Sequence, residues 1–527
     1  MPSRPHGRQE DETQLAFILF LVSCVLGLLA RLAIPASASF PLNDGGLFLQ
    51  MTRDIAADGF GIPAVTTYNH AAIPFAYPPL ALWLTALAID LLGLRPLVVF
   101  QIAPALVSAL TVPAFFLVSQ SLLRRPITAG LATLLFALTP RTYEWQIMGG
   151  GITRAPGFLF ALLALNSFTR GLRGGHDKNL AWAAVWAALT ALTHPEAAFQ
   201  LAIGAALLFL VIDHSARGAV RVAVLAVLIL ILAAPWWATV LSRHGVDPFL
   251  AAIRAAGQDS TNLLGRLFSA FRFEFTGEAY LSLAAMLTLI GLAAGSAPVT
   301  RLLLAIWMFV SYLAEPRGGT LFMMIPASML GGLGLEGLLH LAGHPGEQAS
   351  NARRSLPQVL DAAGPRTMLA FIIMYMLVAA YVTPFKVLRH ATLKASEIRA
   401  MAWIGAKTPP DATFLVLTAG QPLLDPASDW FPALSDRISA ATAFGYEWHP
   451  GFEFAERIRS YQQAQACVQQ SAGCLLAWSE STGIPFTHVY IGPQALRSPI
   501  LTALSQDDNY RVIYTGAEVI ILERIGP

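Results

Sequence analysis

The segment YPPLALWLTALAIDLLG, residues 77–93, decides how this chain is arranged relative to a membrane. It is strongly apolar. A membrane-crossing helix needs about 20 residues, however, and this segment is shorter. Two prolines lie at its start, and Asp90 lies near its end. The segment can therefore cross the bilayer or lie along its surface, and this choice determines the side on which every later segment lies.

The composition of the whole chain requires a membrane. Of its 527 residues, 55% are hydrophobic and only 13% are charged, which is typical of a polytopic membrane protein. The net charge of +2 and the lack of a dense Lys/Arg face give no reason to expect nucleic acid as a partner. Arginine greatly outnumbers lysine, which fits a bacterial source. We therefore expect a multi-pass protein of a bacterial cytoplasmic (inner) membrane, surrounded by membrane lipids.

Eleven other apolar stretches are candidates for transmembrane helices. The first, residues 15–35, is too long for a typical signal-peptide core, so we expect it to be retained. The others are 95–121, 126–140, 156–170, 180–193, 197–213, 222–241, 280–296, 301–313, 319–341 and 367–385. If 77–93 lies in the interface, the basic turn at Arg124–Arg125 and later short basic loops face the cytoplasm, as the positive-inside rule prefers. We therefore predict about 11 transmembrane helices and a first outer loop over 36–94.

The composition changes near residue 391, which divides the chain into a transmembrane domain over 1–390 and a small soluble α/β domain over 391–527. Alternating and helical patterns predict a helix that begins at 396 and is stopped by Pro409–Pro410, a helix at 454–470, strands at 412–419 and 487–493, and a terminal hairpin over 510–525. With about 11 helices, this domain is predicted to be extracytoplasmic. Cys467 and Cys474 could then form a small-loop disulfide, and two free thiols are the alternative.

The first outer loop contains an isolated carboxylate in PLNDGG, residues 41–46. Asp44 precedes a segment that is predicted to form an amphipathic helix at the membrane surface, with one apolar face (Leu47, Met51, Ile55) and aspartates on its other faces (Asp54, Asp58). The simple interpretation is that Asp44 caps this helix. The functional one is a carboxylate that takes a proton from an acceptor group or binds a cation.

A second outer loop, TPRTYEWQIMGGGITRAPG at 139–157, contains Glu144, three consecutive glycines, Arg141 and Arg154. Glycine N–H groups and arginines can converge on an anion such as a phosphate, although arginines at helix ends also serve as interface anchors. Further binding candidates lie near predicted helix ends on the same side: His70, Tyr77, His194, Glu196 and Arg317. A divalent cation is conceivable, but no ligand spacing supports one, so no cofactor is assigned.

The order of these features resembles the GT-C superfamily of integral-membrane glycosyltransferases, especially the bacterial aminoarabinose and protein O-mannosyl transferases. The resemblance rests on the first span, the first-loop acid, the amphipathic segment, YPPL at 77–80, the basic turn at 124–125 and EPRGGTLFMMIPASMLGGLG at 315–334. Two stretches after residue 400, MAWIGAKTPPDATFLV and DWFPALSDRISAATAFGYEW, resemble extracytoplasmic domains attached to some members. No catalytic residue is carried over into this region.

The resemblance implies a lipid-linked sugar donor carried on a polyprenyl phosphate and an acceptor of unknown identity. It implies that Asp44 is the catalytic base or an organiser of the site, and it makes Glu144, by its position, the candidate for a second acid. Our hypothesis takes Asp44 as the base and adds that Arg141, Arg154 or Arg317 neutralises the leaving phosphate. Asn43 stands where many members have a second acid beside the first. A transporter or lipid-linked-glycan flippase, a binding scaffold and a polysaccharide ligase are the alternatives.

Overall fold

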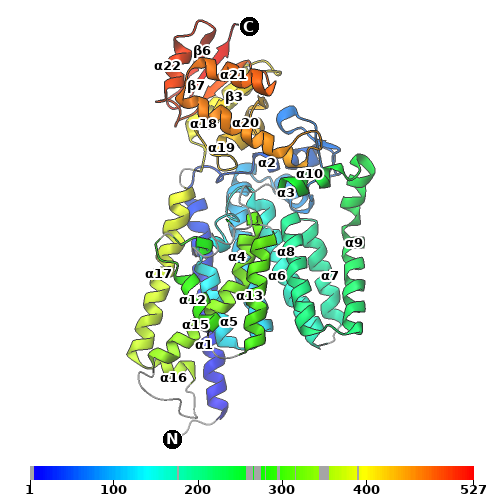
Figure 1. Cartoon of the computed structure of the whole chain (residues 1–527), viewed down its shortest axis with the longest axis vertical. Coiled ribbons are helices and arrows are strands. Elements are labelled where there is room, and N and C mark those ends of the chain that lie inside the picture. Colours follow the sequence, from blue (N-terminus) through cyan, green and yellow to red (C-terminus); the bar gives the residue numbers. More distant parts are fainter. Residues whose placement is uncertain are drawn as a thin grey trace.

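The computed structural model describes residues 5–174, 177–256, 265, 274–278, 280–293, 297–314, 316–343, 355–388 and 391–526. A long bundle of helices forms most of the molecule, and a compact C-terminal part lies on one end of it (Figure 1). The N-terminus lies at the opposite end of the bundle (Figure 1). An odd number of membrane crossings would separate the two termini in this way.

The bundle contains helices of very different lengths. Seven are long and apolar enough to cross a membrane, and three others among the described residues of the bundle, Pro126–Leu138, Leu283–Ala293 and Pro298–Ala314, are shorter and apolar. The helices of the bundle are α1 (Pro5–Ser37), α4 (Pro96–Leu123), α5 (Pro126–Leu138), α6 (Gly151–Gly174), α7 (Asp177–Ala191), α8 (Pro195–Ile212), α9 (Ala216–His244), α12 (Leu283–Ala293), α13 (Pro298–Ala314), α15 (Met324–Ala342) and α17 (Ala363–Leu388). Short helices α14 (Pro316–Phe322) and α16 (Leu356–Leu360) connect some of them. The predicted α-helical polytopic membrane protein is confirmed.

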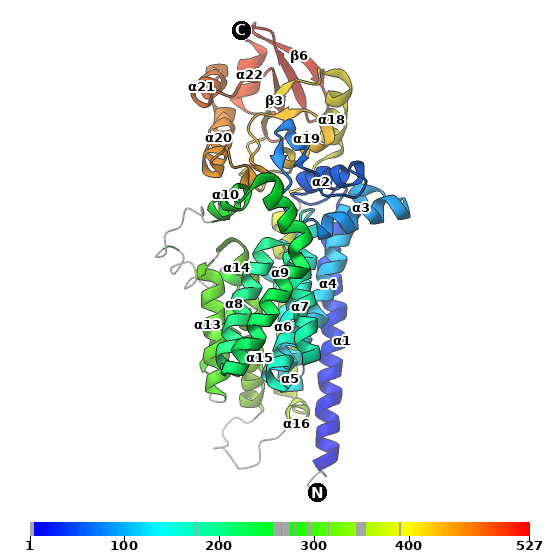
Figure 2. The same cartoon turned by 90° about the vertical axis from the view of Figure 1, so that its right-hand side faces the viewer.

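The ambiguous segment 77–93 forms α3 (Leu80–Leu92), which does not run inside the bundle. It lies beside α2 (Gly46–Ala57) at the end of the bundle that carries the C-terminal part (Figure 2). Only the face with Ala81, Leu82, Thr85 and Ala86 is buried, while Leu91 and Leu92 are exposed. This arrangement agrees with the interfacial interpretation, in which α3 rests against the lipid rather than crossing it.

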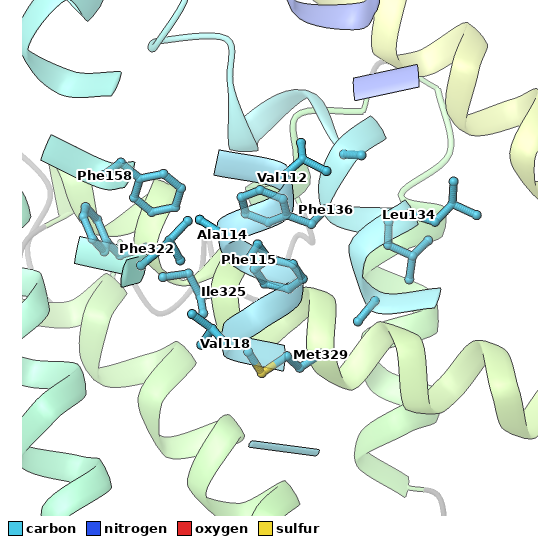
Figure 3. Close-up of a cluster of buried hydrophobic side chains, with 14 of the residues drawn as sticks. Val112, Ala114, Phe115, Val118, Leu134, Phe136, Phe158, Phe322, Ile325 and Met329 are labelled. Carbon is cyan, nitrogen blue, oxygen red and sulfur yellow. The ribbon is translucent and has the colours of Figure 1, made fainter. Parts of the chain in front are cut away.

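Aromatic side chains fill the centre of the bundle (Figure 3). The rings of Phe115 on α4 and Phe136 on α5 stack with their centroids 4.1 Å apart. Phe158 on α6 meets Phe322 on α14 edge to face at 4.9 Å. Because lipid tails are as apolar as these side chains, tight packing rather than exclusion of water holds the helices together. Each such ring pair adds about 0.5–1.5 kcal/mol beyond its buried area.

The GGLG sequence of α15 allows two neighbouring helices to approach its backbone closely. A Cβ on Gly332 would lie 2.8 Å from the backbone nitrogen of Ala132 on α5. A Cβ on Gly334 would lie 2.1 Å from the carbonyl oxygen of Leu287 on α12. Small residues at such contacts are typical of membrane helix interfaces. This late motif of the sequence therefore has a packing role between α5 and α12.

The first outer loop folds into a layer between the bundle and the C-terminal part (Figure 2). Besides α2 and α3 it contains a short antiparallel pair, β1 (Val65–Thr66) and β2 (Ile73–Pro74), around the 3₁₀ turn η1 (Tyr68–His70). The predicted apolar face of α2 is buried. Asp54, which was predicted on another face, is buried as well, and it accepts hydrogen bonds from Thr66 in β1 and from Thr67. The described helix α10 (Asp247–Ala256) lies at this same end (Figure 2).

The C-terminal part has a five-stranded sheet in the order β4-β3-β5-β7-β6. Strands β4, β3 and β5 are parallel, and β7 and β6 join them as an antiparallel hairpin. The strands are β3 (Thr413–Leu417), β4 (Ile438–Ser439), β5 (His488–Ile491), β6 (Tyr510–Thr515) and β7 (Ile520–Arg524). The helices are α18 (Ala395–Lys407), α19 (Pro426–Ser435), α20 (Phe454–Ala466), α21 (Ala472–Thr482) and α22 (Pro499–Ser505). The sequence patterns located α18, α20, β3, β5 and the hairpin.

A disulfide joins Cys467 and Cys474, whose Cα atoms are 5.6 Å apart. The predicted helix over 454–470 ends earlier, because α20 stops at Ala466 and a 3₁₀ turn, Cys467–Gln469, follows it. The bridge connects this turn to the start of α21. It thus closes a short loop that joins the end of α20 to the first turn of α21.

Candidate active site

The carboxylate of Asp44 is held by the second outer loop and the start of α6. Arg154 donates from Nη1 to Oδ2 at 2.8 Å and from Nη2 to Oδ1 at 2.9 Å. The backbone N–H of Gly150 donates to Oδ1 at 3.1 Å. Both side chains of the ion pair are largely shielded, with 18% of Arg154 and 11% of Asp44 exposed. One glycine N–H, that of Gly150, and Arg154 do converge on an anion, and this anion is the protein's own carboxylate.

Close backbone contact locks the two loops together. Gly149 N–H donates to the carbonyl oxygen of Leu42 at 2.8 Å. A Cβ on Gly149 would lie 2.0 Å from the carbonyl oxygen of Asp44, and one on Gly150 would lie 2.5 Å from its Oδ2. Only residues without a side chain fit here. Two of the three glycines, Gly149 and Gly150, are therefore explained by their approach to Asp44, whereas a Cβ on Gly151 would meet the carbonyl oxygen of Gln146.

The interpretation of Asp44 as a helix cap is wrong. The N-cap of α2 is Gly45, which has no side-chain capping bond, and the carboxylate of Asp44 points to Gly150 and Arg154 instead. The first N–H groups of α2 are satisfied by Asp429 from α19. Its Oδ2 accepts from Gly45 at 2.5 Å and from Gly46 at 2.7 Å, and its Oδ1 accepts from Leu47 at 3.1 Å. A helix needs such acceptors at its start because its first N–H groups have no intrahelical partner.

Tyr77 joins the same cluster from the start of the interfacial segment. Its hydroxyl lies 2.9 Å from Oγ1 of Thr153, which is the neighbour of Arg154 in α6. Its ring meets His194 edge to face, with centroids 6.4 Å apart, and Trp448 at 5.6 Å. Burial raises the pKa of the Tyr77 hydroxyl well above its usual value, so this hydroxyl stays protonated near neutral pH.

His194 and Glu196 lie at the start of α8. His194 is the N-cap of this helix, and its Nδ1 accepts from the N–H of Ala197 at 3.4 Å. Glu196 lies in the first turn, close enough to Tyr77 and Arg154 to interact with them electrostatically. The structure thus brings together five of the predicted residues: Asp44, Tyr77, Arg154, His194 and Glu196.

Other predicted residues do not join this cluster through any described contact. Arg141 pairs with Glu144 at 2.6 Å, and its Nε donates to the carbonyl oxygen of Phe275. His70 lies 3.2 Å from the exposed carboxylate of Asp436 at the contact with the C-terminal part. Arg317 belongs to α14, but its side chain lies outside the described residues. Two of the predicted acids, Asp44 and Glu144, are thus each paired with a predicted arginine.

Three side chains after residue 420 reach this site, and sequence reasoning missed all of them. Besides the bonds of Asp429, Trp430 donates from Nε1 to the carbonyl oxygen of Asn43 at 2.8 Å, and Trp448 packs on Tyr77. All three lie in DWFPALSDRISAATAFGYEW, the stretch that carried the resemblance of the C-terminal region. The resemblance of that whole stretch to known domains was the signal that pointed to this region, and it did not single out any of the three residues.

Asp429 has an unusual electrostatic environment. Burial and the nearby charge of Asp44 raise the pKa of Asp429 to about 7. The three N–H donors act in the opposite direction, because they stabilise the charged form. Asp429 therefore titrates near neutral pH.

The described donor set does not fit a divalent cation. Among the described residues, no group of three or more His, Cys, Asp or Glu side chains is arranged to hold a metal ion. Asp44 uses three hydrogen bonds on Arg154 and Gly150, and Glu144 is paired with Arg141. A hard cation needs several converging oxygen ligands. We therefore derive no step through a metal.

Comparisons with known proteins agree on the fold. The family model described as dolichyl-phosphate-mannose-protein mannosyltransferase matches residues 76–238. No curated protein sequence matches significantly. ArnT from Cupriavidus metallidurans in the apo state is similar, with a TM-score of 0.57 and 15% identity over 96% of this chain and 97% of that one. The oligosaccharyltransferase AglB from Archaeoglobus fulgidus has a TM-score of 0.58 and 14% identity over 91% of this chain and 69% of that one.

The mycobacterial arabinofuranosyltransferase AftD is similar to this chain as well. Its TM-score is 0.52 with 15% identity, over 96% of this chain and 40% of that longer one. At such identities the likeness concerns the fold, and it extends over the bundle and the C-terminal part together. The chain therefore has the fold of these glycosyltransferase structures, and the family model matches within it over residues 76–238.

Proposed function

We propose that this protein is a glycosyltransferase that moves a sugar from a polyprenyl-phosphate carrier to an acceptor, with Asp44 as the base. The observation that carries the proposal is the oriented, shielded carboxylate of Asp44 at the end of the bundle where α2, α3 and the C-terminal part meet. The fold supports the donor class, because one solved structure of ArnT contains undecaprenyl phosphate and one of AglB contains a dolichol-phosphate.

Hydrogen-bond counting points to one atom of Asp44. A carboxylate offers about four lone-pair sites, two on each oxygen. Oδ1 accepts from Arg154 Nη2 and from Gly150 N–H, whereas Oδ2 accepts only from Arg154 Nη1 among the described residues. The second lone pair of Oδ2 is thus the one that can take a proton from the acceptor.

The reaction then balances as a single displacement. The acceptor oxygen or nitrogen attacks the anomeric carbon, the bond from that carbon to the phosphate oxygen breaks, and the phosphate leaves with the electron pair. The proton of the acceptor passes to Oδ2 of Asp44. Attack opposite to the leaving phosphate inverts the anomeric centre.

Arg154 is better suited to orient Asp44 than to bind the leaving phosphate. Its two Nη atoms are directed at Asp44, and its Nε donates to the carbonyl oxygen of Trp145 at 3.0 Å. Arg141 is likewise paired with Glu144. The cation that neutralises the phosphate is therefore left unassigned in this proposal.

The side of the membrane is part of the proposal. The short basic loops favour a cytoplasmic position for the N-terminal end of the bundle. Asp44 and the C-terminal part would then lie outside the cytoplasmic membrane of a bacterium. A disulfide between Cys467 and Cys474 is compatible with that compartment.

The test is Asp44→Asn, which keeps the shape of the side chain. Purified protein in nanodiscs is incubated with a panel of undecaprenyl-phosphate-linked and undecaprenyl-pyrophosphate-linked labelled sugars and an acceptor-containing membrane extract, and transfer of label is measured. Loss of a general base lowers the rate by about 10²–10⁴-fold. Asp58→Asn, an exposed aspartate at the other end of α2, is the matched control and should transfer normally. Wild-type transfer by the Asp44→Asn protein would refute the assignment.

A further inference from the structure

The chain on both sides of Asp44 has a backbone conformation that needs support. Asn43 has a φ of 51° and Gly45 a φ of 141°. The first value is uncommon for a residue with a side chain, and such conformations persist only where surrounding contacts hold them. The turn that presents Asp44 is therefore held from outside rather than by its own preference.

The contacts that hold this turn come from two directions. From the membrane side, Gly149 N–H bonds to the carbonyl oxygen of Leu42. From the C-terminal side, Trp430 Nε1–H bonds to the carbonyl oxygen of Asn43 at 2.8 Å, and Asn43 Nδ2–H bonds to the carbonyl oxygen of Leu423 at 3.1 Å. Asp44 thus lies between two sets of contacts, one from the loop that contains Gly149 and one from the C-terminal part.

Among the residues of the C-terminal part, Asp429 makes the largest number of hydrogen bonds to this turn. Its two oxygens accept three consecutive backbone N–H groups, those of Gly45, Gly46 and Leu47, directly after Asp44. The hydroxyl of Tyr68 in turn donates to the backbone oxygen of Asp429 at 2.8 Å and lies 3.3 Å from its Oδ1. This single side chain therefore joins the C-terminal part to the start of α2.

Space around the turn leaves it little freedom to take another position. A Cβ on Gly46 would lie 2.3 Å from the backbone oxygen of Asp429, and one on Gly45 would lie 2.7 Å from the ring of Trp430. The N-terminus of α2 thus touches α19 directly. A movement of α19 would move Gly45, and Asp44 with it.

We propose that Asp429 is a positioning residue for transfer, which holds Asp44 against Arg154 by binding the three N–H groups that follow it. The C-terminal part then completes the active site although it contributes no reacting group. This inference rests on the proposed function of Asp44. It assigns to the C-terminal part a role in the chemical step rather than only in recognition.

Asp429→Asn is a sharp perturbation. One of the two acceptor oxygens becomes an NH₂ group, a donor that faces N–H donors, so at least one bond to α2 is lost. Displacement of a reacting group by about 1 Å can lower a rate by about 10²-fold. We expect kcat to fall about 10–100-fold while the affinity for undecaprenyl phosphate, used as a probe of the donor lipid, stays within about twofold.

Asp436→Asn is the matched control. Asp436 follows the same helix and bonds to His70 in the first outer loop, but it does not touch the start of α2. This variant removes an aspartate at the same interface with no expected effect on kcat. Tyr68→Phe is a milder second variant, which removes only the support that the hydroxyl gives to Asp429 and should lower kcat a few-fold.

The experiment uses the full chain in nanodiscs and has two readouts. Hydrogen exchange followed by mass spectrometry of peptides over 42–50 should accelerate at least tenfold in Asp429→Asn and remain unchanged in Asp436→Asn. Turnover and undecaprenyl phosphate binding are measured on the same samples. If Asp429→Asn does not fold, Tyr68→Phe decides the matter with the same readouts.

The outcomes separate the two proposals. Unchanged exchange over 42–50, or faster exchange with wild-type turnover, would overturn the positioning role. A wild-type protein that transfers no sugar would overturn the proposed function instead. In that case the exchange readout still decides whether Asp429 holds the turn.

Discussion

Gly150→Ala changes the site by one methyl group and removes no charge. The added Cβ would lie 2.5 Å from Asp44 Oδ2, 2.8 Å from its Cγ and 2.9 Å from Arg154 Nη2. The N–H that bonds to Oδ1 is retained, because alanine has the same backbone. The substitution therefore tests the position of the Asp44–Arg154 pair and nothing else in its chemistry.

The distances determine the expected magnitude. Atoms that are not bonded to each other pack at about 3.5 Å. The carboxylate and the guanidinium must therefore move away from the added methyl group by about 1 Å in total. A shift of this size in a reacting group can lower a rate by about 10²-fold. Overpacking of a tight site also costs about 1–3 kcal/mol of folding free energy. We expect a folded, mildly destabilised protein whose transfer rate is reduced by about 10²-fold.

The assay is sugar transfer in nanodiscs, with unfolding measured on the same preparations. Gly337→Ala is the matched control, because Gly337 lies inside α15 and a Cβ there would meet nothing within 4 Å. This control should keep full activity and gain about 0.4–1 kcal/mol of stability. Wild-type turnover in a folded Gly150→Ala protein would show that the arrangement of Asp44 against Arg154 is irrelevant to the reaction.

Two further predictions concern the C-terminal part. Because the pKa of Asp429 is raised to about 7, the folded state keeps a proton that the unfolded state loses near pH 4, so stability should fall as the pH rises from about 4 to about 7. Unfolding measured at about pH 5 and about pH 8 should show this slope reduced in Asp429→Asn, and an unchanged slope would contradict it. Alkylation of the unreduced, unfolded protein should label Cys24 alone, and reduction should add Cys467 and Cys474; replacing both with serine should cost about 2–3 kcal/mol.

Local patterns predicted the elements well because each depends on residues near one another in the sequence. The apolar stretches became the helices of the bundle, and 77–93 formed a short helix outside the bundle, whose interfacial position stays a prediction. Alternating apolar residues located β3, β5 and the terminal hairpin. The brief strand β4 and the helix α19, which begins at Pro426 and contains Pro432, were missed because neither has a long regular pattern.

The candidate site was predicted less completely for the same physical reason. Asp44, Tyr77 and Arg154 were selected one at a time, since a buried or interfacial ionisable side chain at a helix end is unusual wherever it occurs. Their partners could not be read in the same way. The bond from Arg154 to Asp44 spans 110 residues, and the bonds from Asp429 to α2 span more than 380.

The sequence by itself determined that this chain is a polytopic membrane protein with polar elements gathered at one end, because hydrophobicity and segment length act locally. Only the tertiary structure decided what Asp44 contacts. It showed that Gly150 and Arg154 bind the carboxylate of Asp44, and that α2 is capped by Asp429 from the far end of the chain rather than by its own neighbour. Hydrogen bonds and ion pairs depend on distances in space, and these are fixed only when the bundle and the C-terminal part pack together.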